Sequence, residues 1–317
     1  MKHSEDIVNE IIGLKLKGLS SRKIAKKVFG KESSKSTVND IINRNKPLVK
    51  DSFGQPKVVF LDVEVQGSLN ISFPRFKAFI SPQAVLEEPY LLTYAYNWSH
   101  EDSDNIYCKG LDDYAVFEDD CKNDILLVED LWSVLEEADI VISHNASFDV
   151  GQINNRFAYH GISPPSPYKV ICTLKALKKH FKLPSNSLDA STKYFELERK
   201  LSNEGIKLWV DCFNGDREAF AKMKEYNEGD IPTLRQLYYK VLPFIQNHPN
   251  MALYYDDSKM RCNSCGSENM KKTDKHAYTN LSKFELYMCY DCGTFKRTRK
   301  NVRDKDSMEN TLMNVAG

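Results

Sequence analysis

The sequence predicts an α/β protein in which helices flank a mixed β-sheet, with one small all-helical domain before it and one small cysteine-containing domain after it. Three observations lead to this prediction. The first part of the chain has only helical periodicity, the long middle part has strands first and then alternating helices and strands, and four cysteines are paired near the end. The 317 residues also exceed one typical domain. We predict domains at residues 1–48, 55–250 and 258–303, followed by a polar tail, 304–317, that we expect to be disordered.

The N-terminal domain is predicted from the spacing of its apolar residues. Helical periodicity runs from about residue 4 to 17, Gly18 interrupts it, and two shorter helical segments follow at 22–28 and from about 34 to 44. Helix, turn, helix, turn and helix is the pattern of a helix-turn-helix domain, although a three-helix bundle that binds protein has the same pattern.

The residues in these segments resemble the helix-turn-helix domains of phage and transposon proteins. The resemblance covers Gly-Leu-Ser-Ser-Arg-Lys-Ile-Ala-Lys-Lys-Val and the following Ser-Lys-Ser-Thr-Val-Asn-Asp-Ile-Ile. It implies that the start of the third helix enters the major groove of DNA. The residues that would then face DNA are Lys35, Ser36, Thr37 and Asn39.

The middle domain is predicted from runs of apolar and β-branched residues separated by helical periodicity. Strands at the beginning favour an antiparallel meander, and the later alternation of helices and strands favours a mixed sheet. We predict strands at residues 57–65, 76–80, 91–98 and 140–143, helices at 126–138, 149–160 and 219–239, and a strand-to-helix element at 170–177.

Four carboxylates at the edges of these apolar segments point to the chemistry. Asp62 and Glu64 are two positions apart on a predicted strand, so both side chains point to one face. Together with Asp149 and Asp230 they cannot all ionise close together, because like charges raise one another's pKa. A pair of divalent cations would resolve this conflict, and two carboxylate-bound metals about 4 Å apart are the standard equipment for cutting phosphodiesters. The sequence therefore predicts a metal-dependent nuclease.

The segments that carry these carboxylates resemble, in order and spacing, the DnaQ-like (DEDD) 3′–5′ exonucleases, which have a ribonuclease H-like fold. They are Leu-Asp-Val-Glu, His-Asn-Ala-Ser-Phe-Asp and Tyr-Asn-Glu-Gly-Asp, and the match covers about residues 55–245. The resemblance implies hydrolysis of a nucleic acid from its 3′ end by two Mg²⁺ or Mn²⁺ ions, with release of 5′-mononucleotides. Asp62 would bridge both metals, Glu64 and Asp230 would complete the ligands of the nucleophile-side metal, and Asp149 would hold the second metal through water.

The same resemblance assigns three further residues. Tyr226 lies four residues before Asp230, one helical turn, so its hydroxyl can lie over the same site. A tyrosine here is typical of the tyrosine subclass, in which it orients the attacking water. Asn145 and Phe148 would shape the substrate channel.

The C-terminal domain is predicted from two Cys-x-x-Cys-Gly segments, with 23 residues between Cys265 of the first and Cys289 of the second. Four thiolates bind one tetrahedral Zn²⁺, and the glycine permits the tight turn that directs backbone N–H groups at the thiolates. A pair of disulfides or a redox dithiol are the alternatives, and both are less favoured in a cytosolic protein. The segment resembles a zinc ribbon with a β-hairpin around residues 277–288, and its expected structural Zn²⁺ ligands are Cys262, Cys265, Cys289 and Cys292.

The charge distribution favours a nucleic-acid partner. Residues 1–50 carry 12 Lys and Arg against 5 Asp and Glu (+7), residues 51–257 carry 20 against 32 (−12), and residues 258–303 carry 11 against 4 (+7). Basic modules attract phosphate backbones, while an acidic middle suits a cation-binding centre. The basic and aromatic residues of the zinc ribbon suit nucleic acid, or else the docking of a protein partner.

These features predict a DNA exonuclease, with two groups of alternatives left open. The enzyme could instead be an exoribonuclease or a structure-specific nuclease on the same fold, or the chain could be a non-catalytic DNA-binding regulator. The sequence contains no run of about 18 apolar residues and no signal-peptide pattern at its start, so we expect no membrane partner. We expect a cytoplasmic protein, and the domain combination suggests a bacterial or phage-infected cell.

Overall fold

A computed structural model describes residues 4–16, 21–35, 37, 38, 41, 55–73, 79–197, 205–313 and 315. The chain divides into two compact units, residues 1–56 with 250–268 and residues 57–249 with 269–317, and each is described by itself. The segment predicted as a zinc ribbon has residues in both units, so its domain boundaries stay a prediction.

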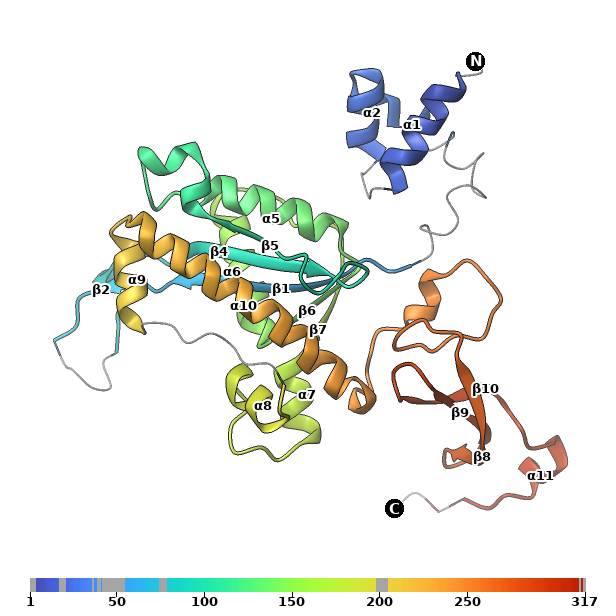
Figure 1. The fold of residues 1–317 in the computed structure, drawn as a ribbon. Helices are drawn as coiled ribbons and strands as arrows, with labels where there is room; N and C mark the ends of the chain where they lie inside the picture. The colour runs from blue at the N-terminus through green and yellow to red at the C-terminus, as the bar shows by residue number, and fades with distance from the viewer. Residues whose placement is uncertain are drawn as a thin grey trace. The chain divides into compact units, whose positions relative to one another are not determined.

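The larger unit contains a five-stranded mixed sheet in the order β5-β4-β1-β6-β7 (Figure 1). β4 pairs antiparallel with both β1 and β5, whereas β6 pairs parallel with β1 and β7. The mixed sheet predicted from the strand order is confirmed, and the sequence analysis missed only its short edge strand β5. The strands are β1 (Val58–Gln66), β4 (Tyr90–Trp98), β5 (Tyr107–Gly110), β6 (Ile140–Ser143) and β7 (Lys169–Cys172).

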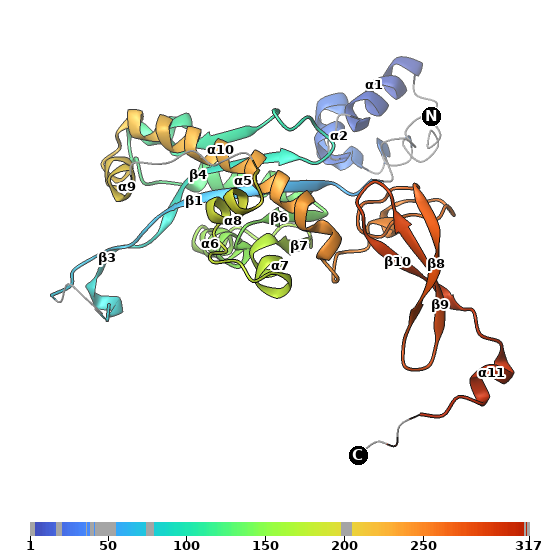
Figure 2. The same ribbon diagram turned by 60° about the horizontal axis from the view of Figure 1, so that its bottom comes forward.

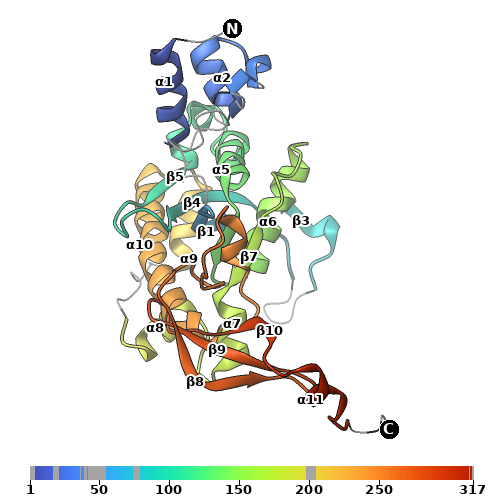
Figure 3. The same cartoon turned by 90° about the vertical axis from the view of Figure 1, so that its right-hand side faces the viewer.

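Helices cover both faces of this sheet. α10 packs against one face, while α5 and α6 lie on the other (Figure 3). The predicted helices at 126–138, 149–160 and 219–239 correspond to α5, α6 and α10, and two short helices, α8 and α9, were not predicted. The helices of residues 57–249 are α5 (Ile125–Glu137), α6 (Ala146–Tyr159), α7 (Thr173–His180), α8 (Leu188–Tyr194), α9 (Ile206–Phe213) and α10 (Arg217–Val241).

Helix α6 begins three residues earlier than predicted because of Asn145. This residue adopts a left-handed backbone conformation with φ of 67°, which asparagine tolerates better than most residues do. The chain can therefore turn directly from the end of β6 into α6. As a result, Asp149 lies in the first turn of the helix rather than at its start.

Successive side chains of strand β1 point to opposite faces of the sheet, so core residues lie on one face and candidate site residues on the other. Val59, Leu61 and Val63 are buried in the main hydrophobic core. Phe60 points to the opposite face, where its ring lies 5.5 Å from that of Tyr238 on α10. Because successive strand residues alternate, Asp62 and Glu64 share the face of Phe60 and are directed toward α10.

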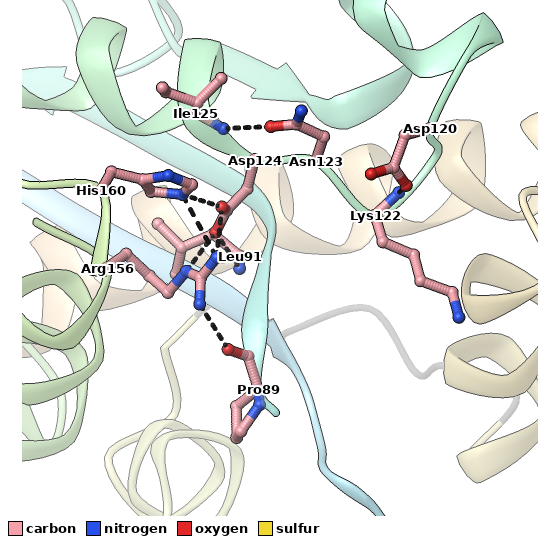
Figure 4. Close-up of polar contacts among 9 residues, drawn as sticks. All are labelled: Pro89, Leu91, Asp120, Lys122, Asn123, Asp124, Ile125, Arg156 and His160. Atoms are coloured by element: carbon pink, nitrogen blue, oxygen red, sulfur yellow. Dashed lines mark hydrogen bonds and ion pairs between the residues drawn. The ribbon is translucent and has the colours of Figure 1, made fainter. Parts of the chain in front are cut away.

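A buried ionic cluster fixes α6 against α5 and the start of β4 (Figure 4). Asp124, at the N-terminus of α5, is fully buried and accepts hydrogen bonds from Arg156 Nε and Nη2 at 2.7 Å each. It also accepts from the backbone N–H of Leu91 at 2.9 Å and contacts His160 Nε2 at 2.6 Å, while Arg156 Nη1 donates to the carbonyl of Pro89. This bidentate geometry with extra hydrogen bonds is what a buried ion pair needs to offset desolvation.

An excursion between β1 and β4 carries a separate two-stranded sheet (Figure 2). It consists of β2 (Leu69–Asn70) and β3 (Val85–Glu87) in antiparallel pairing. A strand was predicted at 76–80, but residues 76–78 lie outside the described residues, and Phe79 and Ile80 are not in a strand. Strand pairing thus occurs on either side of the predicted position.

The smaller unit contains α1 (Glu5–Leu16) and α2 (Ser21–Phe29), which enclose a small core that includes Ile11 and Ile24. Of the third predicted helix, Lys35 and Thr37 are helical, whereas Ser36 and Asn39 lie outside the described residues. The helix-turn-helix arrangement stays a prediction.

The C-terminal part of the chain has an antiparallel sheet in the order β10-β9-β8. Its strands are β8 (Met270–Tyr278), β9 (Lys283–Cys289) and β10 (Phe295–Asn301), so the predicted hairpin corresponds to β8 and β9. The tail for which we predicted disorder includes a short helix, α11 (Lys305–Glu309). The side chain of Asp304 caps this helix by accepting from the backbone N–H of Ser307.

Candidate active site

The four predicted carboxylates line one cavity of about 550 Å³ in the larger unit. Asp62 and Glu64 come from β1, Asp149 from the first turn of α6, and Asp230 from the middle of α10. Carboxylate oxygens of Asp62, Glu64 and Asp230 all lie within 4.8 Å of one another. The fold therefore brings together three segments that are far apart in the sequence.

Asp149 is the most unusual of the four. Its side chain is 3% exposed, and its Oδ2 has no hydrogen-bond partner within the part of the chain that the structure describes. Burial raises the pKa of this carboxyl to about 7, although the backbone N–H groups of Asp149 itself and Val63 partly oppose the shift. A nearby cation would favour the ionised form and satisfy the unpaired oxygen.

The donor set fits hard divalent cations. Carboxylate oxygens are the ligands that Mg²⁺ and Mn²⁺ prefer, and the cavity offers them from three elements of secondary structure. Asp230, 2% exposed, adds a second deeply buried carboxylate to the group. An acidic cluster on an exposed surface would need no ion, but these buried carboxylates are costly to ionise without one.

Two predicted substrate-channel residues also line the cavity. Asn145 lies at the turn between β6 and α6, and the side chain of Phe148 is 47% exposed. A half-exposed aromatic ring beside a polar cavity offers a face on which a nucleobase can stack.

His144 lines the same cavity but is held in place through both ring nitrogens. Its Nδ1 lies 2.9 Å from Thr173 Oγ1, and its Nε2 lies 3.0 Å from the carbonyl oxygen of Asn186. Because a carbonyl can only accept, Nε2 carries the proton and Nδ1 accepts from the hydroxyl of Thr173. Both nitrogens are thus used in joining β6, α7 and the loop that precedes α8.

Tyr226, the predicted water-orienting residue, lies one turn before Asp230 on α10 but is not among the residues that line the cavity. Its ring packs edge to face against Trp209 of α9, with centroids 6.3 Å apart. The indole N–H of Trp209 in turn donates to the carbonyl oxygen of Val65 at 3.1 Å, directly after Glu64. The structure therefore places this tyrosine between α9 and α10.

Sequence reasoning missed two polar residues of the site. Lys178 lines the cavity from α7 and, among its described lining residues, is the one with a permanent positive charge. Asn227 donates a hydrogen bond to Asp62. Neither has a local signal, since lysines recur along α7 and Asn227 stands in a polar stretch of α10. The remaining lining residues without a predicted role are Val63, Leu174, Asn186, Ser187 and Leu188.

The four paired cysteines form a second candidate metal site. One sulfur from each of Cys262, Cys265, Cys289 and Cys292 lies within 4.8 Å of the others. The two Cys-x-x-Cys-Gly segments have the same local geometry, because the glycine after each pair has a left-handed backbone (φ of 77° and 73°) and donates its N–H to the carbonyl of the first cysteine. Four thiols at this separation fit one tetrahedral Zn²⁺.

A family model described as RNase_H superfamily matches residues 102–242. This stretch contains β5 to α10, including Asp149 and Asp230, and the mixed sheet is completed by β1 and β4, which precede it. The matched part of the middle domain is therefore similar to the RNase_H superfamily. This similarity suggests a nuclease that acts on nucleic acid, a class of enzyme that usually uses divalent metals.

The chain matches no curated protein. Within the described residues, no helix combines the length and apolar character that crossing a membrane requires.

Proposed function

We propose that this protein is a metal-dependent 3′–5′ exonuclease that hydrolyses DNA and releases 5′-mononucleotides. The observation that carries the proposal is the convergence of four carboxylates on one cavity of a ribonuclease H-like domain, where the buried Oδ2 of Asp149 has no hydrogen-bond partner among the described residues. Two Mg²⁺ or Mn²⁺ ions, when bound, supply positive charge that activates a water and stabilises the leaving oxygen.

Each carboxylate has a proposed part in holding the ions. Asp62, which groups with Glu64 and Asp230 and lines the same cavity as Asp149, would be the ligand shared by both ions. Glu64 and Asp230 complete one ligand set, and Asp149 holds the second ion through water. The high pKa of Asp149 means that ion binding displaces its proton near neutral pH.

The other lining residues are proposed to hold the 3′-terminal nucleotide. Phe148 stacks on a base, Asn145 hydrogen-bonds to the nucleotide, and Lys178 contacts a phosphate oxygen. Hydrolysis consumes one water: its oxygen bonds to phosphorus, the P–O3′ bond breaks, and the departing O3′ receives a proton. Tyr226, one helical turn before Asp230, is proposed to orient that water.

The flanking modules are proposed to deliver the substrate. A helix-turn-helix with Lys35, Ser36, Thr37 and Asn39 at its DNA-facing helix and a zinc ribbon with exposed Lys and Arg on β10 both attract phosphate backbones. The ribbon is proposed to hold one structural Zn²⁺. The choice of DNA over RNA rests on these modules.

The test is digestion of matched 5′-labelled single-stranded DNA and RNA with Mg²⁺ or Mn²⁺, beside Asp149→Ala. We expect a ladder of DNA products that shortens from the 3′ end and is absent with the variant. A ladder of RNA products alone would identify an exoribonuclease. If neither DNA nor RNA is cleaved but the protein binds duplex DNA tightly, a non-catalytic DNA-binding regulator is favoured. If Asp149→Ala cleaves as well as wild type, the activity belongs to another site.

A further inference from the structure

Asn227 joins the candidate metal site to the rest of the domain through a chain of buried hydrogen bonds. Its side chain is fully buried on α10, three residues before Asp230. Its Nδ2 donates to Asp62 Oδ2 at 2.7 Å, and its Oδ1 accepts from Thr93 Oγ1 at 3.0 Å. Thr93 is itself fully buried on β4 and stands opposite Glu64 in the strand pairing.

The orientation of the amide follows from the chemistry of its two neighbours. An ionised carboxylate can only accept hydrogen bonds, so the NH₂ group of Asn227 must face Asp62. The carbonyl oxygen then faces Thr93, whose hydroxyl donates to it. The opposite orientation would place the amide oxygen against the carboxylate and leave the NH₂ group beside a hydroxyl, so the chain has one favourable arrangement.

The hydrogen bonds from Thr93 through Asn227 hold one oxygen of Asp62 in a fixed position. Oδ2 is held by a short, charge-assisted hydrogen bond from a group that is itself immobilised by burial and by Thr93. The Asp62 carboxylate therefore cannot rotate freely about its Cβ–Cγ bond. In metalloproteins, such outer partners orient the ligands, and their loss typically costs about 10–100-fold in metal affinity.

We propose that Asn227 is a positioning residue that sets the orientation of the Asp62 carboxylate for a divalent ion and makes the site favour Mg²⁺. The inference rests on the metal site of the proposed function. Mg²⁺ demands a near-ideal octahedral arrangement of ligands. A carboxylate that can rotate meets this demand less often, whereas Mn²⁺ tolerates more distortion, so loss of Asn227 weakens Mg²⁺ binding more than Mn²⁺ binding.

The experiment is calorimetric titration of the full chain with Mg²⁺ and with Mn²⁺. Asn227→Leu keeps the approximate shape of the side chain and removes both polar groups. We expect its affinity for Mg²⁺ to fall by about 10–100-fold and its affinity for Mn²⁺ to fall less. Thr93→Val, which removes only the hydroxyl, is expected to lower the metal affinities in the same direction but by less. Thr93→Ser, which keeps the hydroxyl, is expected to have the wild-type affinities.

Tyr238→Phe is the matched control for loss of a polar contact on the same helix. It removes the 2.7 Å hydrogen bond to His248 and leaves Asp62 untouched, so metal affinity is expected to stay at the wild-type value. Thr93→Val keeps the test informative if Asn227→Leu does not fold.

The outcomes separate this inference from the proposed function. Folded Asn227→Leu and Thr93→Val variants with wild-type affinity for both ions would overturn the positioning role even if the protein is an exonuclease. If wild type binds Mg²⁺ and the variants lose affinity as expected, but wild type cuts no nucleic acid, the proposed exonuclease activity is wrong and the positioning role of Asn227 is intact.

Discussion

Two groups of buried acidic residues in the larger unit are satisfied in opposite ways. Asp124 is fully buried and is bound by the guanidinium of Arg156, the imidazole of His160 and a backbone N–H (Figure 4). Asp149 is almost as deeply buried, yet backbone N–H groups are its described partners and one of its oxygens has none. The same helix, α6, carries Asp149 in its first turn and Arg156 two turns later.

The difference separates a structural cluster from a candidate functional one. A carboxylate that meets its cation inside the protein holds elements of the fold together and has no capacity left for a ligand. A buried carboxylate such as Asp149, whose described partners are backbone N–H groups, is costly to ionise, and it retains the capacity to bind a ligand. Burial alone therefore does not mark a candidate site; the partners of the buried group do.

The largest expected effect is on the structural cluster. Arg156→Leu leaves Asp124 buried without its cation and is expected to lower the free energy of unfolding by about 3–5 kcal/mol. Urea denaturation measures this change. Adding Asp124→Leu to the variant is expected to recover much of the loss, because no buried charge then remains; a double variant that is less stable than Arg156→Leu would contradict this view of the cluster.

The next effect is on activity at the four-carboxylate cavity. Asp62→Asn removes a ligand charge and is expected to reduce cleavage by more than about 100-fold, since an outer partner of a ligand is already worth about 10–100-fold. The rate of product release from labelled DNA measures it. Tyr238→Phe serves as the control on α10, and an Asp62→Asn variant with undiminished activity would place the chemistry elsewhere.

A third effect sharpens the comparison through pH. Because burial raises the pKa of Asp149 above its usual value to about 7, the metal-free folded state binds a proton that the unfolded state has already lost. The contribution of the Asp149 carboxyl to stability is therefore present below about pH 4 and is lost as pH rises toward 7. Asp149→Asn cannot ionise. Its free energy of unfolding is expected to exceed that of wild type by about 1–3 kcal/mol at pH 8 and to equal that of wild type at pH 4.

Metal ions should act against this difference in stability between wild type and Asp149→Asn. Urea denaturation at pH 8 with and without Mg²⁺ measures it, and wild type is expected to gain more stability from Mg²⁺ than Asp149→Asn does. If the metal-free variant is less stable than wild type at pH 8, the claim that this carboxylate is held at a cost is wrong.

The smallest effect concerns Lys178, the cation that faces the acidic cavity. Lys178→Ala is expected to weaken substrate binding by up to about tenfold and to reduce the slope of log affinity against log salt by about one. Binding titrations of single-stranded DNA at several salt concentrations measure the slope. Lys178→Arg keeps the charge and is the matched control, and an unchanged slope in Lys178→Ala would exclude a phosphate contact.

Much of the fold follows from local patterns. The apolar, β-branched run of β1 and the helical periodicity of α5 and α10 were predicted to within about two residues at each end, because burial on one or both faces imposes these periods directly. The start of α6 was placed late, since the left-handed conformation of Asn145 is a property of a single residue rather than of a period. The short helices α8 and α9 were missed because seven or eight residues contain too few turns to establish a period.

The sequence by itself determined which carboxylates come together: the order of the three acidic segments and the alternation along β1 predicted Asp62, Glu64, Asp149 and Asp230 as one group, and all four line one cavity. Only the tertiary structure decided how that group is supported. The contacts of Asn227 with Asp62 and Thr93, of Asp124 with Arg156, and of Tyr226 with Trp209 join different elements of secondary structure. Periodicity reports which face of an element is buried, but it does not report which residue of another element is packed there, and that choice is made when the elements pack together.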